Sequence, residues 1–260
     1  MKKRQIVIVL TLIVSGHASA LELKNYSFGI EKYNENYLDY ESGEKFMQEN
    51  SMMTSIIGEA NLYFNEDATI WVSGRYAKGK SDYTGAYTNG VYGDLKVKGI
   101  NRESWEIQTI LKHEFNIESL GSFTIGPGLG LRHLKDSLDQ ASSGGYTRKN
   151  DLSYAIISIS KEFDNKGIFK ITPSVAYKKI IKGKQHSAIE EGVDNIQKNG
   201  YGFDINLAIE KKIYQRSLYV TPFYRFWKIK RSDPAIFRSS TVFEPENTTK
   251  EVGLKIGIQF

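Results

Sequence analysis

The 260-residue sequence contains no cysteine and no long hydrophobic run. Without cysteine, a disulfide framework, a thiolate metal site and a cysteine nucleophile are all excluded. A membrane-spanning helix needs roughly 18 or more consecutive apolar residues, and no segment comes near that length. The mean hydropathy of −0.41 agrees with this. These absences exclude a disulfide-rich secreted fold and a helical membrane protein.

Histidine is also scarce, and the sequence lacks the spacing of known metal or cofactor motifs. The four histidines are His17, His113, His133 and His186, with no pair at helical spacing. Acidic residues between the apolar segments are too scattered for a calcium-binding loop. The glycine-rich residues 126–130 lack the strand–turn–helix context of a phosphate-binding loop. We therefore expect no metal and no cofactor.

The first 20 residues have the three parts of a secretory signal peptide in the right order. Residues 2–4 are basic, residues 6–14 form a short apolar core, and small residues lead up to a cleavage point near Ala20. We expect Sec-type export and a mature chain of residues 21–260. Cleavage removes three of the 35 basic residues and none of the 30 acidic ones, which leaves a net charge of +2. This near balance gives no basis for binding nucleic acid.

Much of the mature chain alternates between apolar and polar residues with a period of two. At the C-terminus the apolar set is Val252, Leu254, Ile256, Ile258 and Phe260. Residues 105–115 and 201–210 repeat the pattern, which places one set of side chains on each face of a strand. Segments of about ten residues have the length at which a tilted strand crosses a membrane. The alternation predicts transmembrane β-strands.

The connections between these segments alternate between short and long. Short polar turns are expected at residues 65–67, 116–118, 164–167 and 212–216, and long connections near residues 39–48, 80–99, 136–148, 182–198 and 231–248. Short periplasmic turns and long external loops are typical of outer-membrane barrels. The sequence predicts an all-β fold, a transmembrane antiparallel β-barrel of about ten strands with both termini in the periplasm. Eight or twelve strands are the alternatives.

Three prolines fall inside expected strands, at Pro127, Pro173 and Pro222. Proline removes a ladder hydrogen bond and is normally confined to strand edges or bulges. We expect a bulge at each of them.

Two short segments resemble a known group, the small outer-membrane β-barrel proteins of Gram-negative bacteria. Residues 253–260 resemble the C-terminal assembly signal of this group, which ends in phenylalanine after alternating apolar residues. Residues 124–131 are similar to the glycine- and proline-rich strands of OmpA-like and opacity-type barrels. The resemblance implies a place in the cell outer membrane, and insertion by the outer-membrane assembly machinery through the Phe260 segment. Ten strands match the omptin protease barrels in size, whereas OmpA-like domains have eight.

The strand phase that turns apolar residues toward lipid turns a balanced set of charges inward. This expected lumen network consists of Glu59, Arg75, Glu106, Lys112, Glu114, Arg132, Lys170, Asp204, Glu210, Arg225, Glu251 and Lys255. Side chains can fill the interior of a barrel near eight strands in size. A small porin, the first alternative, would more plausibly line its constriction with charges of one sign. We therefore expect a lumen plugged by its own side chains.

Lysines follow the apolar stretch on the strands that end at the long connections. They are Lys32, Lys78, Lys135, Lys179 and Lys228. At the outer edge of the apolar band, such side chains can lay their stems on the wall and bind lipopolysaccharide phosphates. The alternative is that each lysine simply marks the point where solvent begins. Phe64, Phe115 and Phe163, beside the short turns, are expected to form the opposite, aromatic edge.

The second long connection contains Tyr83, Tyr87 and Tyr92 among small polar residues. Tyrosine among serine, glycine and asparagine is the composition of many recognition surfaces. These tyrosines are candidates for binding a host or surface ligand, with packing on the barrel rim as the alternative.

The sequence gives little support for an enzyme. Omptin-like proteolysis would require an Asp-x-His element, which does not occur. His133 has Asp136 and Ser137 nearby, and a Ser–His–acid site is recognised by geometry rather than by sequence distance. An outer-membrane hydrolase is therefore the second alternative. We expect a monomeric barrel in the outer membrane with a structural or surface-recognition role and no catalytic residues.

Overall fold

A computed structural model describes residues 21–65, 67–87, 90–118, 121–164 and 167–260. The expected signal peptide, residues 1–20, lies outside these residues. In the described part of the chain, no helix is long and apolar enough to cross a membrane. The one helical element there is a 3-10 turn, η1 (Leu138–Gln140).

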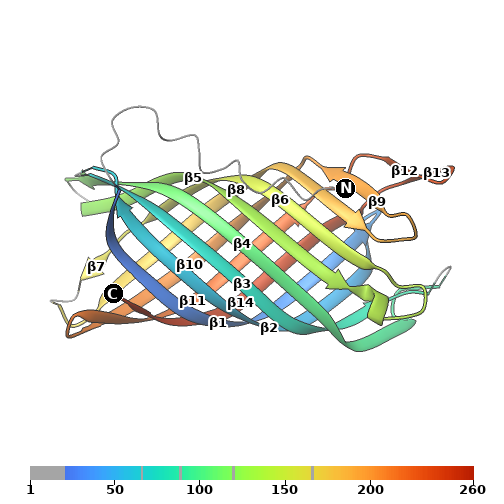
Figure 1. The fold of residues 1–260 in the computed structure, drawn as a ribbon, viewed down its shortest axis with the longest axis horizontal. Coiled ribbons are helices and arrows are strands. Elements are labelled where there is room, and N and C mark those ends of the chain that lie inside the picture. Colours follow the sequence, from blue (N-terminus) through green and yellow to red (C-terminus); the bar gives the residue numbers. More distant parts are fainter. Residues whose placement is uncertain (1–20, 66, 88–89, 119–120, 165–166) are drawn as a thin grey trace.

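Ten long antiparallel strands form a closed barrel, which confirms the expected fold and strand number (Figure 1). In chain order they are β1 (Glu22–Glu41), β2 (Glu44–Tyr63), β3 (Ala68–Gly85), β4 (Leu95–Ile117), β5 (Gly121–Ser137), β6 (Thr147–Ser160), β8 (Lys170–Ser187), β10 (Gly200–Ile213), β11 (Arg216–Ile229) and β14 (Glu246–Gln259). The sheet closes because β14 pairs with β1 as well as with β11. Two short strands, β7 (Phe163–Asp164) and β9 (Val193–Gln197), add to this sheet, and β12 (Ala235–Phe237) and β13 (Ser240–Val242) form a separate two-stranded hairpin.

The outer wall of the barrel is a belt of exposed apolar side chains. Ile30, Ile56 and Leu129 keep 59%, 64% and 54% of their surface exposed. The residues next to each of them in sequence point inward. A continuous apolar belt of this kind is the lipid-facing band of a transmembrane barrel. Phe64 and Phe163 are also exposed beside the short turns. Phe115 is half-buried, and its ring stacks on Phe123.

The barrel has two different ends, here called the short-turn end and the loop end. The short turns follow β2, β4, β7 and β10. The start of β1 and the end of β14 lie at the same end of the barrel, because Glu22 is opposite Tyr63 and Ser27 is opposite Gln259. Figure 1 shows the C-terminus at the same end of the barrel as β7. The connection between β12 and β13 lies at the loop end, together with β9 and η1.

The expectation of a long connection at residues 39–48 is wrong. Strands β1 and β2 run on to Glu41 and Glu44, and Ser42 and Gly43 alone form the turn, both with positive φ (52° and 86°). Two central residues with positive φ are the commonest way to join a tight hairpin. At the loop end the strands likewise continue into other segments expected to be loops, as far as Gly85, Leu95 and Ser187. These strand extensions carry polar residues on both faces, with a few apolar ones such as Leu95 and Val97, so they lack the regular apolar–polar alternation from which strands were expected.

The bulges expected at the prolines are absent from the described ladder. Pro127, Pro173 and Pro222 lie opposite Ile157, Leu207 and Leu254 without a shift of register. In an antiparallel ladder each residue's N–H points toward only one neighbouring strand, so a proline removes a single bond. The shifts occur elsewhere, between Leu23 and Asn25, Asp39 and Tyr40, Ser81 and Tyr83, and Ser153 and Tyr154.

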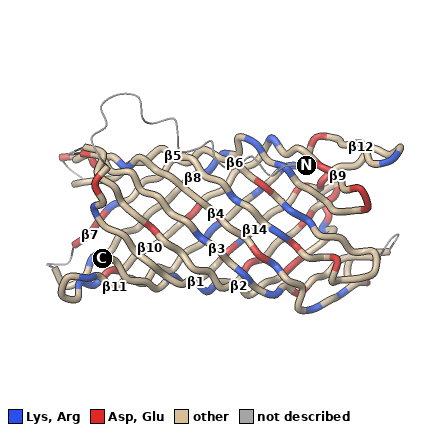
Figure 2. Tube along the Cα trace, viewed as in Figure 1, with Lys and Arg blue, Asp and Glu red and all other residues tan. Residues whose placement is uncertain are grey.

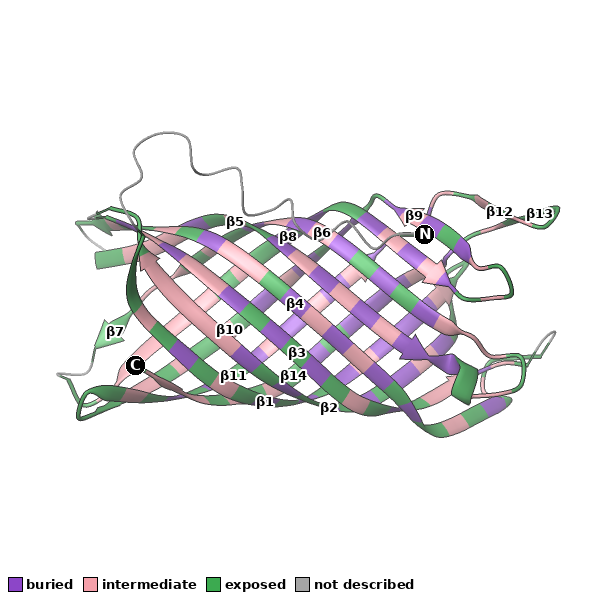
Figure 3. Cartoon of the chain, viewed as in Figure 1, coloured by how far each residue is buried: buried purple, intermediate pink, exposed green. Residues whose placement is uncertain are grey.

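The interior is filled more completely toward the loop end than toward the short turns. Figure 3 shows buried positions concentrated in the loop-end half of the barrel. Aromatic side chains account for much of this filling: Tyr33, Tyr154, Phe223 and Trp227 are all buried, and the rings of Tyr154 and Trp227 meet edge to face at 4.9 Å. The barrel wall therefore encloses two unlike compartments.

Candidate functional site

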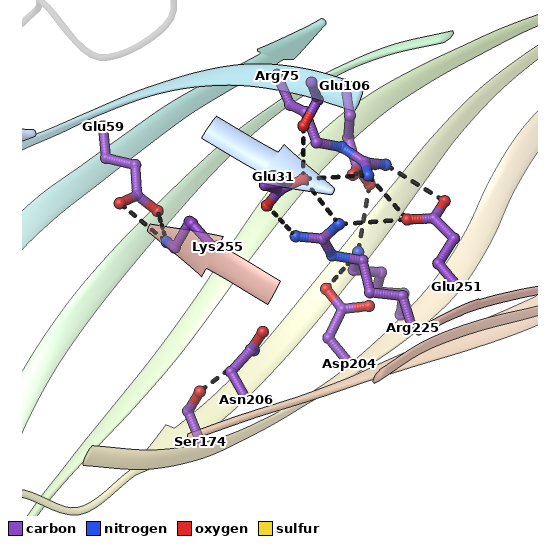
Figure 4. Close-up of polar contacts among 12 residues, drawn as sticks. Glu31, Glu59, Arg75, Glu106, Ser174, Asp204, Asn206, Arg225, Glu251 and Lys255 are labelled. Carbon is purple, nitrogen blue, oxygen red and sulfur yellow. Dashed lines mark hydrogen bonds and ion pairs between the residues drawn. The ribbon is translucent and has the colours of Figure 1, made fainter. Parts of the chain in front are cut away.

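The middle of the lumen holds a cluster of buried charges, shown in Figure 4 and here called the central cluster. It consists of Glu31, Arg75, Glu106, Lys178, Asp204, Arg225 and Glu251, all buried. These residues occupy the inward phase of seven different strands, β1, β3, β4, β8, β10, β11 and β14. Charged residues of both signs are accordingly found along the middle of the wall as well as at its ends (Figure 2).

Ion pairs connect non-adjacent strands across the central cluster. Arg75 Nη1 lies 2.8 Å from Glu251 Oε2, and Arg75 Nη2 lies 3.3 Å from Glu106 Oε2. Arg225 Nη2 donates to Glu31 Oε1 at 2.5 Å. Two bidentate guanidinium groups thus share three carboxylates, a geometry that adds orientation as well as charge compensation.

Lysine and tyrosine complete the pairing on the opposite wall. Lys178 Nζ lies 2.7 Å from Asp204 Oδ2 and 3.2 Å from Glu106 Oε1. The Tyr154 hydroxyl donates to Glu106, and the Ser55 hydroxyl donates to Glu31 at 2.8 Å. Arg132 is buried beside this cluster with its guanidinium 5.6 Å from the centre of the Trp227 ring. Charges taken out of water need such partners, because an unpaired buried charge is very costly.

A second group of buried charges, the loop-end cluster, lies closer to the long connections. It consists of Glu35, Asp39, Glu49, Arg102, Asp136, Arg148 and Glu244. Arg102 forms ion pairs with Glu35, with Glu49 at 3.2 Å and with Asp136 at 2.7 Å. Ser81 donates to Glu49 at 2.7 Å. This cluster has five carboxylates for two cations, compared with four carboxylates for three cations in the central cluster.

Glu244 attaches the hairpin of β12 and β13 to the lumen. Its carboxylate pairs with Arg148, which also lies 3.0 Å from Asp39 and 3.1 Å from the Tyr37 hydroxyl. The backbone N–H of Glu244 donates to the Ser232 hydroxyl at 2.8 Å, and the Ser232 N–H donates to the Glu244 carbonyl at 3.0 Å. The hairpin is therefore closed at its base and held to the barrel by the buried Glu244 side chain, together with Asn195 Nδ2, which donates to the Val242 carbonyl at 3.4 Å.

The short-turn half of the lumen contains a cavity of about 260 Å³. Arg75, Glu106, Asp204 and Arg225 form its floor toward the central cluster. Its walls carry mainly hydroxyl and amide side chains, together with Trp71 and Lys112. The lumen is therefore obstructed at its centre and hollow on the side of the short turns.

Comparison with known proteins identifies the fold but finds no family model or curated protein that matches the sequence. Among solved structures, the outer membrane protease OmpT of Escherichia coli aligns over 95% of this chain and 99% of its own, with 10% identity and a TM-score of 0.57. The fold is that of a small outer-membrane β-barrel. At this identity the likeness shows the fold alone.

Two further outer-membrane barrels align with lower scores. Neisserial surface protein A has 9% identity over 90% of this chain and 97% of its own, with a TM-score of 0.39. The outer membrane protein OprG of Pseudomonas aeruginosa has 9% identity over 90% of this chain and 95% of its own, with a TM-score of 0.37.

Five of the residues expected in the lumen network lie together in the structure. Arg75, Glu106, Asp204, Arg225 and Glu251 belong to the central cluster. Glu59 and Lys255 form a separate pair at 3.0 Å on the cavity wall, and Lys112 lies 4.9 Å above the ring of Trp71.

The expectation that Glu114 and Lys170 belong to the lumen network is wrong. Glu114 is exposed, and Lys170 pairs with the exposed Glu162 at 3.0 Å. Both lie within a few residues of a short turn, where the mouth of the barrel meets water. The inward phase at a strand end leads into solvent rather than into the packed lumen.

Glu31, Lys178 and the whole loop-end cluster were not predicted from the sequence. Glu31 lies between Ile30 and Lys32, and Lys178 precedes Lys179, so the inward phase was available as a signal for both. Four members of the loop-end cluster lie in segments expected to be loops, and Glu35, Glu49 and Arg102 lie just outside those segments. There the alternation of apolar and polar residues has stopped, and no pattern in the sequence marked the inward face.

The five candidate lysines all lie on the outer face of the barrel. Lys32, Lys78 and Lys179 are exposed. Lys135 pairs with Glu103 at 3.1 Å, and Lys228 pairs with Glu246 at 2.8 Å. Along the ladder, Lys32 and Lys78 both lie opposite Thr54, and Lys135 lies directly opposite Lys149.

The three candidate tyrosines separate into two groups. Tyr83 is half-buried and packs against the buried cluster that includes Tyr37 and Leu134. Tyr87 and Tyr92 are exposed, and the Tyr92 hydroxyl donates to Gln48 at 3.0 Å.

The three residues of the candidate hydrolytic set do not meet. His133 lies on the outer face, where Nδ1 is 2.7 Å from Asp151 and the ring stacks on Trp105. Asp136 and Ser137 are buried, and Asp136 is bound to Arg102. Asp136 points to the opposite face of β5 from His133, and among the described residues the His133 ring bonds to Asp151 rather than to Asp136 or Ser137.

Replacing Lys178 with methionine should strongly destabilise the barrel. The change leaves Glu106 and Asp204 without their lysine in a buried site, which costs roughly 3–5 kcal/mol. The free energy of unfolding can be measured by urea titration of the protein refolded in lipid vesicles. Lys179→Met is the matched control, because this neighbouring lysine is exposed on the outer face. Equal stability of the two variants would contradict a structural role for the central cluster.

The docking of the β12–β13 hairpin should depend on pH. Burial raises the pKa of the Glu244 carboxyl from 4.5 to about 7, against the opposing effect of Arg148 and with a further upward contribution from Asp39. An acid with a raised pKa binds its proton more tightly when docked, so docking is favoured at low pH. It weakens as pH rises from about 4.5 through 7, by up to about 3 kcal/mol.

Because the chain has no cysteine, a spin label on Ser240→Cys would report this docking alone. Ser240 lies in the exposed strand β13. We expect the label to become more mobile between pH 5 and pH 8. With Glu244→Gln as the control, mobility should no longer change over this range, and an unaltered pH response in that variant would refute the assignment.

Proposed function

We propose that this protein is an integral outer-membrane barrel with a closed lumen, and that its loop end serves a structural or recognition role at the cell surface. The likeness to an outer-membrane fold and the belt of exposed apolar side chains support the location. The arrangement of the ends supports an orientation with the short turns and both chain ends in the periplasm, since short turns face that side in barrels of this kind. Phe260, which stacks on Tyr26 at 5.1 Å, then closes the segment read by the assembly machinery.

The observation that carries a closed lumen is the succession of buried layers across it. The loop-end cluster, the aromatic layer around Tyr154 and Trp227, and the central cluster follow one another along the barrel. Each contains side chains with almost no exposed surface: Arg102, Trp227 and Lys178 keep 1% or less. A passage for ions would require several ion pairs to separate in a low-dielectric interior, at a high cost in free energy.

The loop end offers exposed apolar and aromatic side chains for recognition. Val91 and Ile236 keep 70% and 71% of their surface exposed, and Tyr87 keeps 59%. They belong to two separate connections, the segment between β3 and β4 and the β12–β13 hairpin. Exposed apolar groups on polar loops are typical of binding surfaces. We propose that Tyr87 and Tyr92, rather than Tyr83, contribute to binding a host or surface ligand.

The outer-face lysines support binding of lipopolysaccharide in the outer leaflet. Lys135 and Lys149 lie directly opposite each other on neighbouring strands, where like charges repel. A phosphate between them would remove this repulsion. Lys32, Lys78 and Lys179 add positive charge at the border of the apolar belt, next to Ile30, Tyr76 and Tyr177 in the outward phase.

The refolded protein should not conduct ions when inserted into a planar lipid bilayer. We expect no stable current steps of a few hundred picosiemens or more, an order-of-magnitude threshold for an open lumen. As the positive control, Lys178 and Asp204 would be replaced together by serine, which enlarges the lumen and leaves Glu106 paired with Arg75. Stable ion-selective steps in the unaltered protein would refute the proposed function and favour a small porin.

Replacing Lys32, Lys78 and Lys179 together with glutamine should lower the lipopolysaccharide that co-purifies with the protein several-fold. These lysines are exposed and would lose only their charge. Lys24, Lys211 and Lys212, replaced together, provide the control with the same change of charge at the short-turn end. The heat-modifiable band on a gel would verify folding. Equal lipopolysaccharide in both triple variants would show that the lysines only mark the solvent boundary.

A further inference from the structure

The cavity in the short-turn half is created by small side chains on one wall. Ser158 and Ser160 come from β6, Ser174 and Ala176 from β8, and Asn206 from β10. The inward positions in the loop-end half are instead filled by large aromatic side chains such as Tyr154 and Trp227. The hollow therefore reflects the choice of residues in these three strands, since the barrel wall itself is continuous around it.

The opposite wall of the cavity presents a flat aromatic ring and a cation. Lys112 Nζ lies 4.9 Å from the centre of the Trp71 ring, and Gln108 lines the same strand. Among the described residues, no carboxylate lies within ion-pair distance of Lys112. The other charges of the cavity are paired: Glu59 with Lys255, and Arg75 and Arg225 with carboxylates of the central cluster.

The cavity is closed toward the loop end and approached from the short turns. The central cluster forms its floor, whereas the residues near its other end, such as Glu114, are exposed to water. Its volume of about 260 Å³ lies below the roughly 300–1,000 Å³ of pockets for drug-sized ligands. A solute with a single ring fits this space, and an oligomer does not.

We propose that the cavity binds a monosaccharide acid, with its carboxylate on Lys112 and its sugar ring beside Trp71. The hydroxyl and amide groups of Ser158, Ser174 and Asn206 would bind the sugar hydroxyls, and Asn206 Nδ2 already donates to Ser174 Oγ at 3.3 Å (Figure 4). A few convergent polar groups beside an aromatic ring are the usual makeup of a small-molecule site. The site does not depend on whether the lumen conducts, so it stands apart from the proposed function.

Isothermal titration of the refolded protein with sodium glucuronate tests the site, with glucose as the neutral probe. We expect saturable binding of one glucuronate per protein, at least tenfold tighter than glucose. Lys112→Met should reduce glucuronate affinity at least tenfold and abolish its advantage over glucose. Ser174→Leu, which fills the hollow, should abolish binding of both sugars.

Two control variants test the contributions of the lysine and of the cavity wall separately. Lys179→Met removes an outer-face lysine, and Tyr177→Leu changes an outward side chain on the same strand as Ser174; both should bind glucuronate like the unaltered protein. If Ser174→Leu does not fold, the comparison of glucuronate with glucose in Lys112→Met still decides. Absence of saturable glucuronate binding, equal affinity for the two sugars, or unchanged binding in Lys112→Met would each overturn the proposal.

Discussion

The compensation of buried charge inside a closed wall is the constraint on which the rest of this barrel depends. Because the outward face must be apolar, charged side chains on the membrane-spanning strands can only point inward. Arg75 then connects β3 to β14 and β4, and Arg225 connects β11 to β1. The contacts from β3 to β14 and from β11 to β1 run between strands that are not neighbours, so they fix the cross-section that backbone hydrogen bonds alone leave free to deform. The lumen takes the place of a hydrophobic core.

The two charge clusters solve this constraint differently. The central cluster has cations for most of its carboxylates, with Arg132 close by. In the loop-end cluster, Arg102 and Arg148 face five carboxylates. Burial and the neighbouring charge of Asp136 raise the pKa of the Glu49 carboxyl well above its usual value, against the opposing effect of Arg102. Proton binding at Glu49 is thereby favoured at the loop end.

The sequence predicted the central cluster well and the loop-end cluster not at all, for one physical reason. Glu106 lies between Trp105 and Ile107, and Asp204 lies between Phe203 and Ile205, so lipid-facing neighbours identify each as inward. Beyond the membrane the outer face meets water, and polar residues suit both faces. Glu49 lies between Gln48 and Asn50 and has no such neighbours. The direction of its side chain follows only from the register of β2 against β1 and β3, which depends on pairings distant in sequence.

The two halves of the barrel share a continuous wall and the same alternation of inward and outward residues. The volume of the inward side chains explains why the loop-end half is filled and the short-turn half is hollow. In the loop-end half, inward positions carry Tyr33, Tyr154 and Trp227, and their rings occupy the cross-section. In the short-turn half, corresponding positions carry Ser158, Ser174 and Ala208. A hydroxyl wall can remain hydrated, so this half has no need of filling, whereas the central cluster requires packing above it to exclude water and strengthen its ion pairs. The aromatic layer and the central cluster thus depend on each other, and the hollow below them is the part of the lumen that stability leaves free for a ligand.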